Sequence, residues 1–111
     1  MGIMICAQHG KQGIRINIDK EIVKDIDFDK AIQEEDLIIV TVSFYDKTEF
    51  LYEERRLLKK DTFVRNKLKH SYIIREEEEE KELISLDALL TGICGKCYSE
   101  YMSKHNISIE F

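Results

Sequence analysis

Five short segments of the chain are rich in apolar residues and are bounded by polar ones, a pattern typical of β-strands. Residues 37–40 are all apolar and residues 41–45 alternate, so segment 36–45 is predicted to lie at the centre of a sheet. In segment 14–18, strict alternation predicts that Ile14, Ile16 and Ile18 all face the core. The predicted strands are residues 3–6, 14–18, 36–45, 71–75 and 107–111.

Three other segments carry apolar residues at three- and four-residue spacing, which predicts helices. Residues 19–33 fit a short helix or an acidic loop, interrupted near residues 27–29. The run of glutamates is followed by leucines at helical spacing, which indicates a helix over residues 83–90. A third helix is predicted to carry Cys97 in its first turn and to stop at Asn106.

Residues 49–60 fit two different structures. Residues 53–56, two glutamates followed by two arginines, are good helix formers and favour a helix. The spacing of Phe50, Tyr52 and Leu58 also fits the second strand of a hairpin that turns at residues 46–48. The helix is the preferred prediction, and the hairpin remains the alternative.

These elements predict a single mixed α/β or α+β domain over residues 1–111, with a mainly antiparallel sheet around residues 37–45. The 111 residues suffice for one domain and are too few for two ordinary ones. No apolar run approaches the ~20 residues that cross a bilayer, and the N-terminal sequence lacks the features of a signal peptide. We therefore expect a soluble, cytoplasmic protein.

Two pairs of potential metal ligands lie near the two ends of the chain. Cys6 and His9 form a CxxH pair, and Cys94 and Cys97 form a CxxC pair that uses the remaining cysteines. Ligands separated by two residues can turn toward one point, and four such ligands make a closed tetrahedral zinc site. Gly10 frees the backbone after His9 to fold back, with amides directed at a ligand sulfur. We expect a structural zinc ion that joins the terminal segments, because four protein ligands leave no open position for catalysis.

The four ligands resemble those of a treble-clef zinc finger. In that resemblance Cys6 and His9 match the ligands of the knuckle, and Cys94 and Cys97 match the ligands at the start of the helix. The chain departs from the family pattern in two ways: a histidine replaces one knuckle cysteine, and more than eighty residues separate the two halves. The fold name carries no function with it.

A redox role for Cys94 and Cys97 is the other interpretation of the CxxC motif. A thioredoxin-like site needs a strand immediately before the motif, within a βαβ unit. The leucine spacing instead predicts that a helix precedes it, which favours the metal site.

The distribution of charge suggests a partner of opposite sign. The net charge is −5, which disfavours general affinity for nucleic acid or anionic membranes. No Gly-rich phosphate loop, nucleophile elbow or other catalytic constellation is recognisable, so we expect a non-enzymatic protein. The leading hypothesis is an acidic inhibitor or immunity-type protein that neutralises a basic partner, such as a nuclease toxin. The predicted partner-binding residues are the successive glutamates Glu76, Glu77, Glu78, Glu79 and Glu80.

The alternative hypothesis is a zinc-finger protein that binds nucleic acid. Between residues 55 and 70 the only acidic residue is Asp61, so a local excess of positive charge is available for phosphates. The simpler interpretation is a solvated surface balanced by the flanking acids. The basic residues of this segment are Arg55, Arg56, Lys59, Lys60, Arg65, Lys67 and Lys69.

Overall fold

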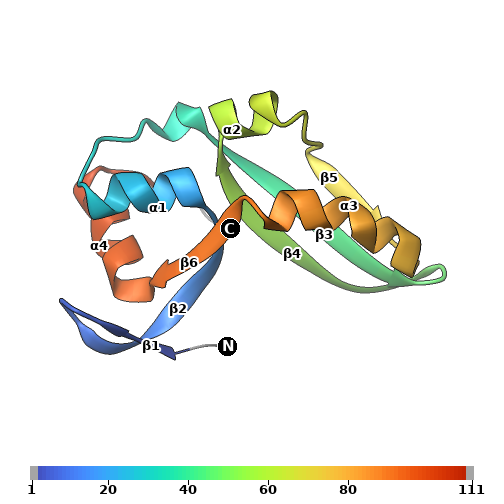
Figure 1. The fold of residues 1–111 in the computed structure, drawn as a ribbon, viewed down its shortest axis with the longest axis horizontal. Helices are drawn as coiled ribbons and strands as arrows, with labels where there is room; N and C mark the ends of the chain where they lie inside the picture. The colour runs from blue at the N-terminus through green and yellow to red at the C-terminus, as the bar shows by residue number, and fades with distance from the viewer. Residues whose placement is uncertain (1–2, 110–111) are drawn as a thin grey trace.

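Strand β2 connects the two ends of the chain. In the computed structural model, which describes residues 3–109, β1 (Ile3–Cys6) and β2 (Gly10–Asp19) form an antiparallel hairpin. Further along, β2 pairs antiparallel with β6 (Leu90–Cys94) and, at Ile18, parallel with β4 (Glu49–Lys59). The first and last strands described are therefore neighbours of one central strand (Figure 1).

The second half of the sheet is a long hairpin with one added strand. Strand β3 (Leu37–Asp46) pairs antiparallel with β4 on one side and parallel with β5 (Ser71–Ile74) on the other. The predicted central position of residues 36–45 is thus confirmed. The turn at residues 46–48 is also confirmed, with Lys47 in the left-handed region at φ 59°.

The helix predicted for residues 49–60 is wrong, and the hairpin alternative is correct. Leu57 and Leu58 are consecutive and fully buried, because they enter different hydrophobic clusters on opposite faces of the sheet. Pairing along almost the whole length of β3 outweighs the helix propensity of residues 53–56. Glu54 and Arg56 lie on one face of the strand and form an ion pair there.

Within residues 3–109 the fold is α+β, with six strands in a mostly antiparallel mixed sheet and four α-helices. The helix predicted near residue 20 ends before Phe28, and the C-terminal helix carries Cys97 in its first turn, as expected. Asn106 follows that helix with φ 56°, consistent with its predicted role as a stop. No helix in this range is long and apolar enough to cross a membrane. The helices are α1 (Lys20–Asp27), α2 (Lys60–Arg65), α3 (Glu77–Asp87) and α4 (Gly95–Lys104), with a 3-10 helix η1 (Glu34–Asp36).

The last predicted strand does not form over residues 107–109, and residues 110–111 lie outside the described part of the chain. Ile107 is buried in the core, which accounts for its apolar character. The backbone amide and hydroxyl of Ser108 both donate to Glu34 Oε1, at 2.9 and 3.2 Å. The Glu34 carboxylate thus accepts the backbone hydrogen bond of Ser108 that a neighbouring strand would otherwise accept.

Ile16 does not face the core as predicted. The register of β2 against β6 shifts between Arg15 and Ile18, and Asn17 adopts φ 64°. Such a bulge breaks the two-residue periodicity of a strand. Ile16 is consequently 51% exposed, whereas Ile18 is completely buried.

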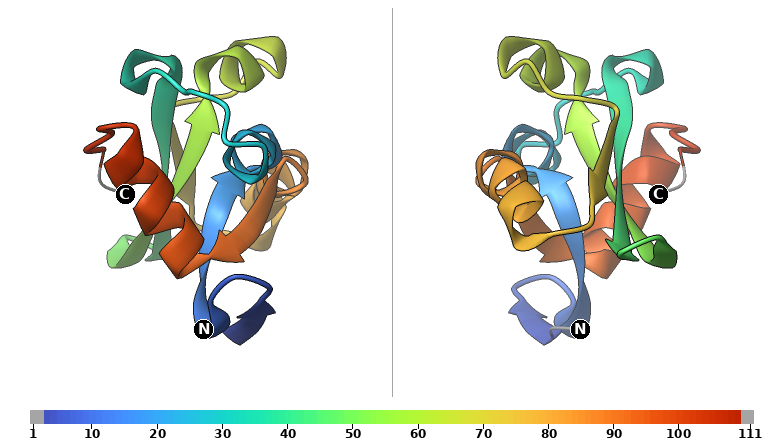
Figure 2. Two further views of the ribbon diagram at one scale, coloured as in Figure 1. Left: turned by 90° about the vertical axis from the view of Figure 1, so that its left-hand side faces the viewer. Right: turned by 90° about the vertical axis from the view of Figure 1, so that its right-hand side faces the viewer.

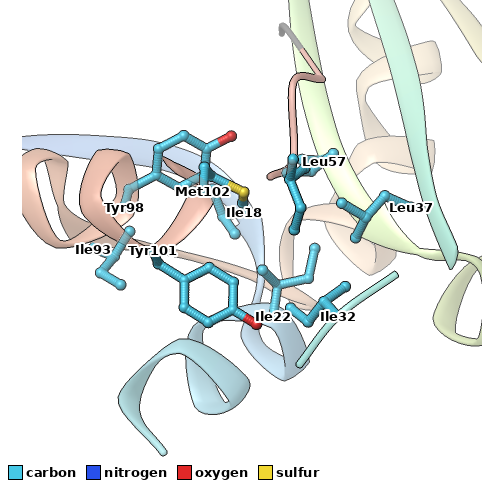
Figure 3. Packing of buried hydrophobic residues seen from close by; sticks show 10 residues of the cluster. Ile18, Ile22, Ile32, Leu37, Leu57, Ile93, Tyr98, Tyr101 and Met102 are labelled. Atoms are coloured by element: carbon cyan, nitrogen blue, oxygen red, sulfur yellow. The ribbon is translucent and has the colours of Figure 1, made fainter. Parts of the chain in front are cut away.

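Two hydrophobic clusters lie on opposite faces of the β3–β4 ribbon. Figure 2 shows α4 on one side of this ribbon and α3 on the other. The cluster on the α4 side joins the core of the metal-ligand end to Leu57, and Figure 3 shows Tyr98, Tyr101 and Met102 gathered with Ile18. The other cluster packs α3 onto the sheet and contains Val40, Val42, Leu58, Tyr72, Ile74, Leu83 and Leu86.

The buried carboxylate of Asp19 joins three elements of the fold. It is only 1% exposed, and its two oxygens accept hydrogen bonds from different backbone amides. Oδ1 accepts from Glu21 at 2.9 Å and caps α1, while Oδ2 accepts from Lys59 at the end of β4 at 3.0 Å. Asp19 therefore links β2, α1 and β4.

Replacing Asp19 with Ala is expected to lower the free energy of unfolding by about 3 kcal/mol, because two charge-assisted hydrogen bonds are lost. Urea denaturation measures this change. Asp27→Ala is the control: Asp27 is exposed at the end of the same helix, and its loss should change stability by less than about 0.5 kcal/mol. Equal effects of the two substitutions would contradict this role of Asp19.

Candidate metal centre

The two predicted ligand pairs meet in space. Cys6 ends β1 and His9 lies in the tight turn that follows it, while Cys94 ends β6 and Cys97 lies in the first turn of α4. One ligand atom from each residue can be chosen so that all four lie within 4.8 Å of one another. The structure thus brings together all four residues expected to bind metal.

The distances within the cluster fit a tetrahedral site. A metal–sulfur distance of about 2.3 Å and a metal–nitrogen distance of about 2.0 Å imply tetrahedral edges of roughly 3.8 Å between sulfurs and 3.5 Å between sulfur and nitrogen. The Sγ atoms of Cys6 and Cys97 are 3.5 Å apart. His9 Nδ1 lies 3.7 Å from Cys6 Sγ, 3.8 Å from Cys94 Sγ and 3.4 Å from Cys97 Sγ. The four side chains can therefore hold a metal ion with little rearrangement.

Glu100 orients the imidazole of His9. While Nδ1 faces the three sulfurs, Nε2 lies 3.0 Å from Glu100 Oε2. The pKa of His9 is raised above its ordinary value, mainly by the hydrogen bond to Cys6. The hydrogen bond to Cys94 and the negative charge of Glu100 contribute smaller increases. A carboxylate on the far nitrogen of a ligand histidine fixes the ring and the tautomer. Sequence reasoning missed Glu100, although its position three residues after Cys97 places both on one face of α4.

The turn around Cys6 is built to stabilise a thiolate. Backbone amides of Gln8 and His9 bond to the Cys6 sulfur and lower the pKa of Cys6 to about 6. Gly10 adopts φ +71°, which permits the fold-back expected after the second ligand. Gln12 Nε2 donates to the carbonyl of His9 at 3.1 Å and supports the same turn.

The sulfurs of the cluster cannot all ionise easily without a cation. Burial, together with the adjacent Cys6 and Cys94, raises the pKa of Cys97 to about 12. The three cysteines carry free thiols, and like charges at these distances disfavour one another. A cation held by the four side chains would remove that repulsion.

Contacts at both ends of α4 hold its ligands in place. Its first turn follows β6, which pairs with β2, so Cys94 and Cys97 approach the turn that carries Cys6. Near its C-terminus, Lys104 and His105 both bind Asp29, beyond the end of α1. These two contacts, Lys104 first, hold the pKa of Asp29 below its usual range.

The structure corrects one argument about the CxxC motif. A strand, β6, directly precedes Cys94, where a helix was expected. That strand is antiparallel to its neighbour β2, however, so it does not form the parallel βαβ unit of a thioredoxin-like site. The Cys97 sulfur lies 3.4 Å from His9 Nδ1 and 3.5 Å from Cys6 Sγ, within the four-residue cluster, which favours metal binding.

The other predicted site residues lie outside this cluster. The glutamates 76–80 occupy the start of α3, and the basic residues 55–69 are distributed over β4, α2 and the following loop. Most of those basic residues are engaged in ion pairs, including Arg56, which is only 4% exposed and contacts Glu54 and Asp87. His70 packs against Phe63 with ring centroids 4.6 Å apart and is not a ligand of the cluster.

Comparison with family models, with curated proteins and with solved structures gave no match to this chain. The residues themselves therefore define its class: an α+β domain whose terminal segments are joined by a Cys/His cluster that can hold a metal ion.

Replacing Glu100 with Ala is expected to weaken metal binding roughly tenfold or more, because His9 loses the acceptor that orients it. Competition between the chain and a chromophoric chelator for Co²⁺ measures the affinity. Glu100→Gln keeps an acceptor oxygen and should lose less. Ser99→Ala, an exposed neighbour on α4, is the control and should bind as tightly as the unmodified chain; a similarly unchanged affinity for Glu100→Ala would remove it from the site.

Replacing Cys97 with Ser is expected to lower the melting temperature and to abolish tight metal binding, since folding and metal affinity are coupled. We expect a loss of at least about 3 kcal/mol in the free energy of unfolding of the metal-loaded chain. Thermal unfolding with and without chelator measures it. His70→Ala should keep both metal content and melting temperature, and a lost metal equivalent in that variant would show that the ligand set is different.

Proposed function

We propose that the cluster of Cys6, His9, Cys94 and Cys97 binds a structural zinc ion. Thiolate sulfur and imidazole nitrogen in a tetrahedral arrangement are the ligands of structural zinc. Four protein ligands leave no position for substrate, and Cys94 is almost completely buried. When bound, zinc supplies a divalent charge that stabilises the thiolates and links the terminal segments.

We further propose that the knuckle at residues 6–9 and the ligand helix α4 form a unit similar to a treble clef. Support comes from the order of its parts: a ligand turn within a hairpin, then a ligand pair at a helix start. The rest of the domain is inserted between His9 and Cys94, which are 85 positions apart. Zinc in such a unit serves folding and leaves function to the surface.

The proposed function is non-enzymatic binding of a basic protein partner through the acidic start of α3. The observation that carries this proposal is the lack of counter-ions there: among residues 3–109, none forms an ion pair with Glu76, Glu77, Glu78 or Glu80. Within the described part of the chain, the carboxylate of Glu79 accepts a hydrogen bond from the Arg75 amide and forms no ion pair. Carboxylates at a helix N-terminus stabilise the helix through its dipole. When they have no counter-ion within the chain, they also attract a cationic partner and speed its association.

Elsewhere on the surface, most acidic side chains already have partners. Asp25 pairs with Lys59, Asp61 with Arg65, and Glu82 with Lys69. Glu53 pairs with Arg55 and Asp87 with Arg56 in the same way. The glutamate run is the largest contiguous group of carboxylates without such compensation, which makes it the stronger candidate for a docking surface.

The most specific form of this proposal is an inhibitor or immunity-type protein acting in the cytoplasm. A small acidic domain can cover the cationic cleft of a nuclease by presenting carboxylates where phosphates would bind. A metal-stabilised domain loses little conformational freedom on binding, which favours affinity.

The nucleic-acid hypothesis receives less support. Five of its seven basic residues, Arg55, Arg56, Lys59, Arg65 and Lys69, form ion pairs within the chain. Phosphates would have to displace these carboxylates before counter-ion release could contribute to binding. The hypothesis stays a prediction, tested by salt-dependent binding to polyanions.

Replacing Glu76, Glu77 and Glu80 with Gln is expected to abolish capture of a basic partner while leaving the fold intact. Capture is measured by immobilising the chain or a variant and identifying the retained protein by mass spectrometry. The control removes the same charge from Asp27, Glu35 and Asp36, which are exposed. It should retain the partner. A partner that is acidic, or that binds the α3 variant normally, would contradict the proposal; a captured nuclease that loses activity on addition of the chain would support its inhibitor form.

A further inference from the structure

A groove of about 280 Å³ lies beside the glutamate run. Strands β3, β4 and β5 provide its aromatic and aliphatic wall, including Phe44, Tyr52 and Ile74. The start of α3 provides its acidic rim, through Glu77 and Glu80. Figure 1 shows why these parts meet: α3 begins near the turn of the β3–β4 hairpin, at the end of the molecule opposite α4 and β1.

The aromatic wall is ordered and open to solvent. The rings of Phe44 and Tyr52 stack with centroids 4.6 Å apart and an interplanar angle of 18°. Tyr52 and Leu51 remain 51% and 53% exposed, although they lie in the longest strand pair of the sheet. Large apolar side chains that stay exposed beside a groove indicate an interaction surface.

One cation of the chain already binds an aromatic ring of this groove. The guanidinium carbon of Arg75 lies 5.4 Å from the ring centroid of Tyr45, a cation–π distance. The described part of the chain places no cation over Phe44 or Tyr52. Arg75 itself lines the groove but lies over Tyr45, so the ring of Tyr52, flanked by carboxylates, carries no cation of the described chain.

We propose that this groove receives an arginine side chain of the basic partner, with the guanidinium over Tyr52 and its N–H groups directed to the carboxylates of Glu77 and Glu80. This proposal rests on the proposed function and names the part of the acidic surface that gives it specificity. Charge complementarity fixes the occupant: an apolar chain would leave the carboxylates desolvated, and an anion would be repelled.

Arginine fits this groove better than lysine. Its planar guanidinium can stack on an aromatic ring while its N–H groups donate to carboxylates at the rim. Its aliphatic stem matches the apolar wall formed by Leu51 and Ile74. The groove's volume of about 280 Å³ suffices for one arginine side chain.

The test uses the metal-loaded chain and a short Gly-Ser peptide that carries arginines, with the same peptide carrying neutral citrulline as control. Two-dimensional NMR of the ¹⁵N-labelled chain maps the bound peptide and gives its dissociation constant. We expect shifts confined to residues 44–52 and 74–80. Tyr52→Leu keeps the apolar bulk but removes the aromatic face, and should weaken the arginine peptide roughly three- to fivefold.

Charge variants separate the groove from the acidic surface as a whole. Glu77→Gln with Glu80→Gln should weaken binding strongly, whereas Glu35→Gln with Asp36→Asn, of equal charge change, should not. If the α3 variant loses binding but Tyr52→Leu does not, the acidic surface stands and the groove is overturned. If neither acidic pair matters, or if the citrulline peptide binds equally well, the proposed function and the groove both fail. Spectra of each variant without peptide verify that it is folded.

Discussion

The interaction on which the rest of this fold depends is the convergence of three cysteine sulfurs and one imidazole nitrogen, which lie close enough together to coordinate a single cation. Burial and the neighbouring thiols raise the pKa of Cys97 to about 12, whereas the backbone amides of Gln8 and His9 lower the pKa of Cys6 to about 6. The ligands come from positions up to 91 residues apart. Any affinity of the folded cluster for metal therefore stabilises the whole arrangement in which β1, β2, β6 and α4 meet.

From this cluster, packing extends through the domain by way of β2. The buried carboxylate of Asp19 ties the end of β2 to α1 and β4, and Leu57 carries the same hydrophobic cluster onto the β3–β4 ribbon. The ribbon then continues away from the metal cluster, with α3 packed on its other face. At one end of the molecule the Cys/His cluster joins the N- and C-terminal segments. The opposite end carries the carboxylates without ion-pair partners, beside exposed aromatic rings.

The sequence predicted which four Cys and His residues cluster, because their spacing and residue type alone indicate it. Two ligand pairs with an adjacent glycine need no knowledge of the intervening chain, and the same holds for the apolar run that forms β3. Prediction failed where tertiary context decides. Leu57 and Leu58 lie in a strand that is buried on both faces, where a helix was predicted. The bulge at Asn17 turns Ile16 toward solvent. Ile107 is buried in the core although no strand forms there. The role of Glu100 could not be predicted, because it depends on which face of α4 turns toward the cluster and on how the His9 ring is oriented.

Elemental analysis of chain purified without chelator, paired with mass spectrometry of its cysteines, shows whether the four clustered side chains bind an ion. We expect about one zinc per chain and three reduced thiols, the stoichiometry of a closed four-ligand site. A chain free of metal that retains its native melting temperature, or one with a disulfide between Cys94 and Cys97, would contradict it. Either result would mean that hydrophobic packing around β2 alone holds the N- and C-terminal segments together.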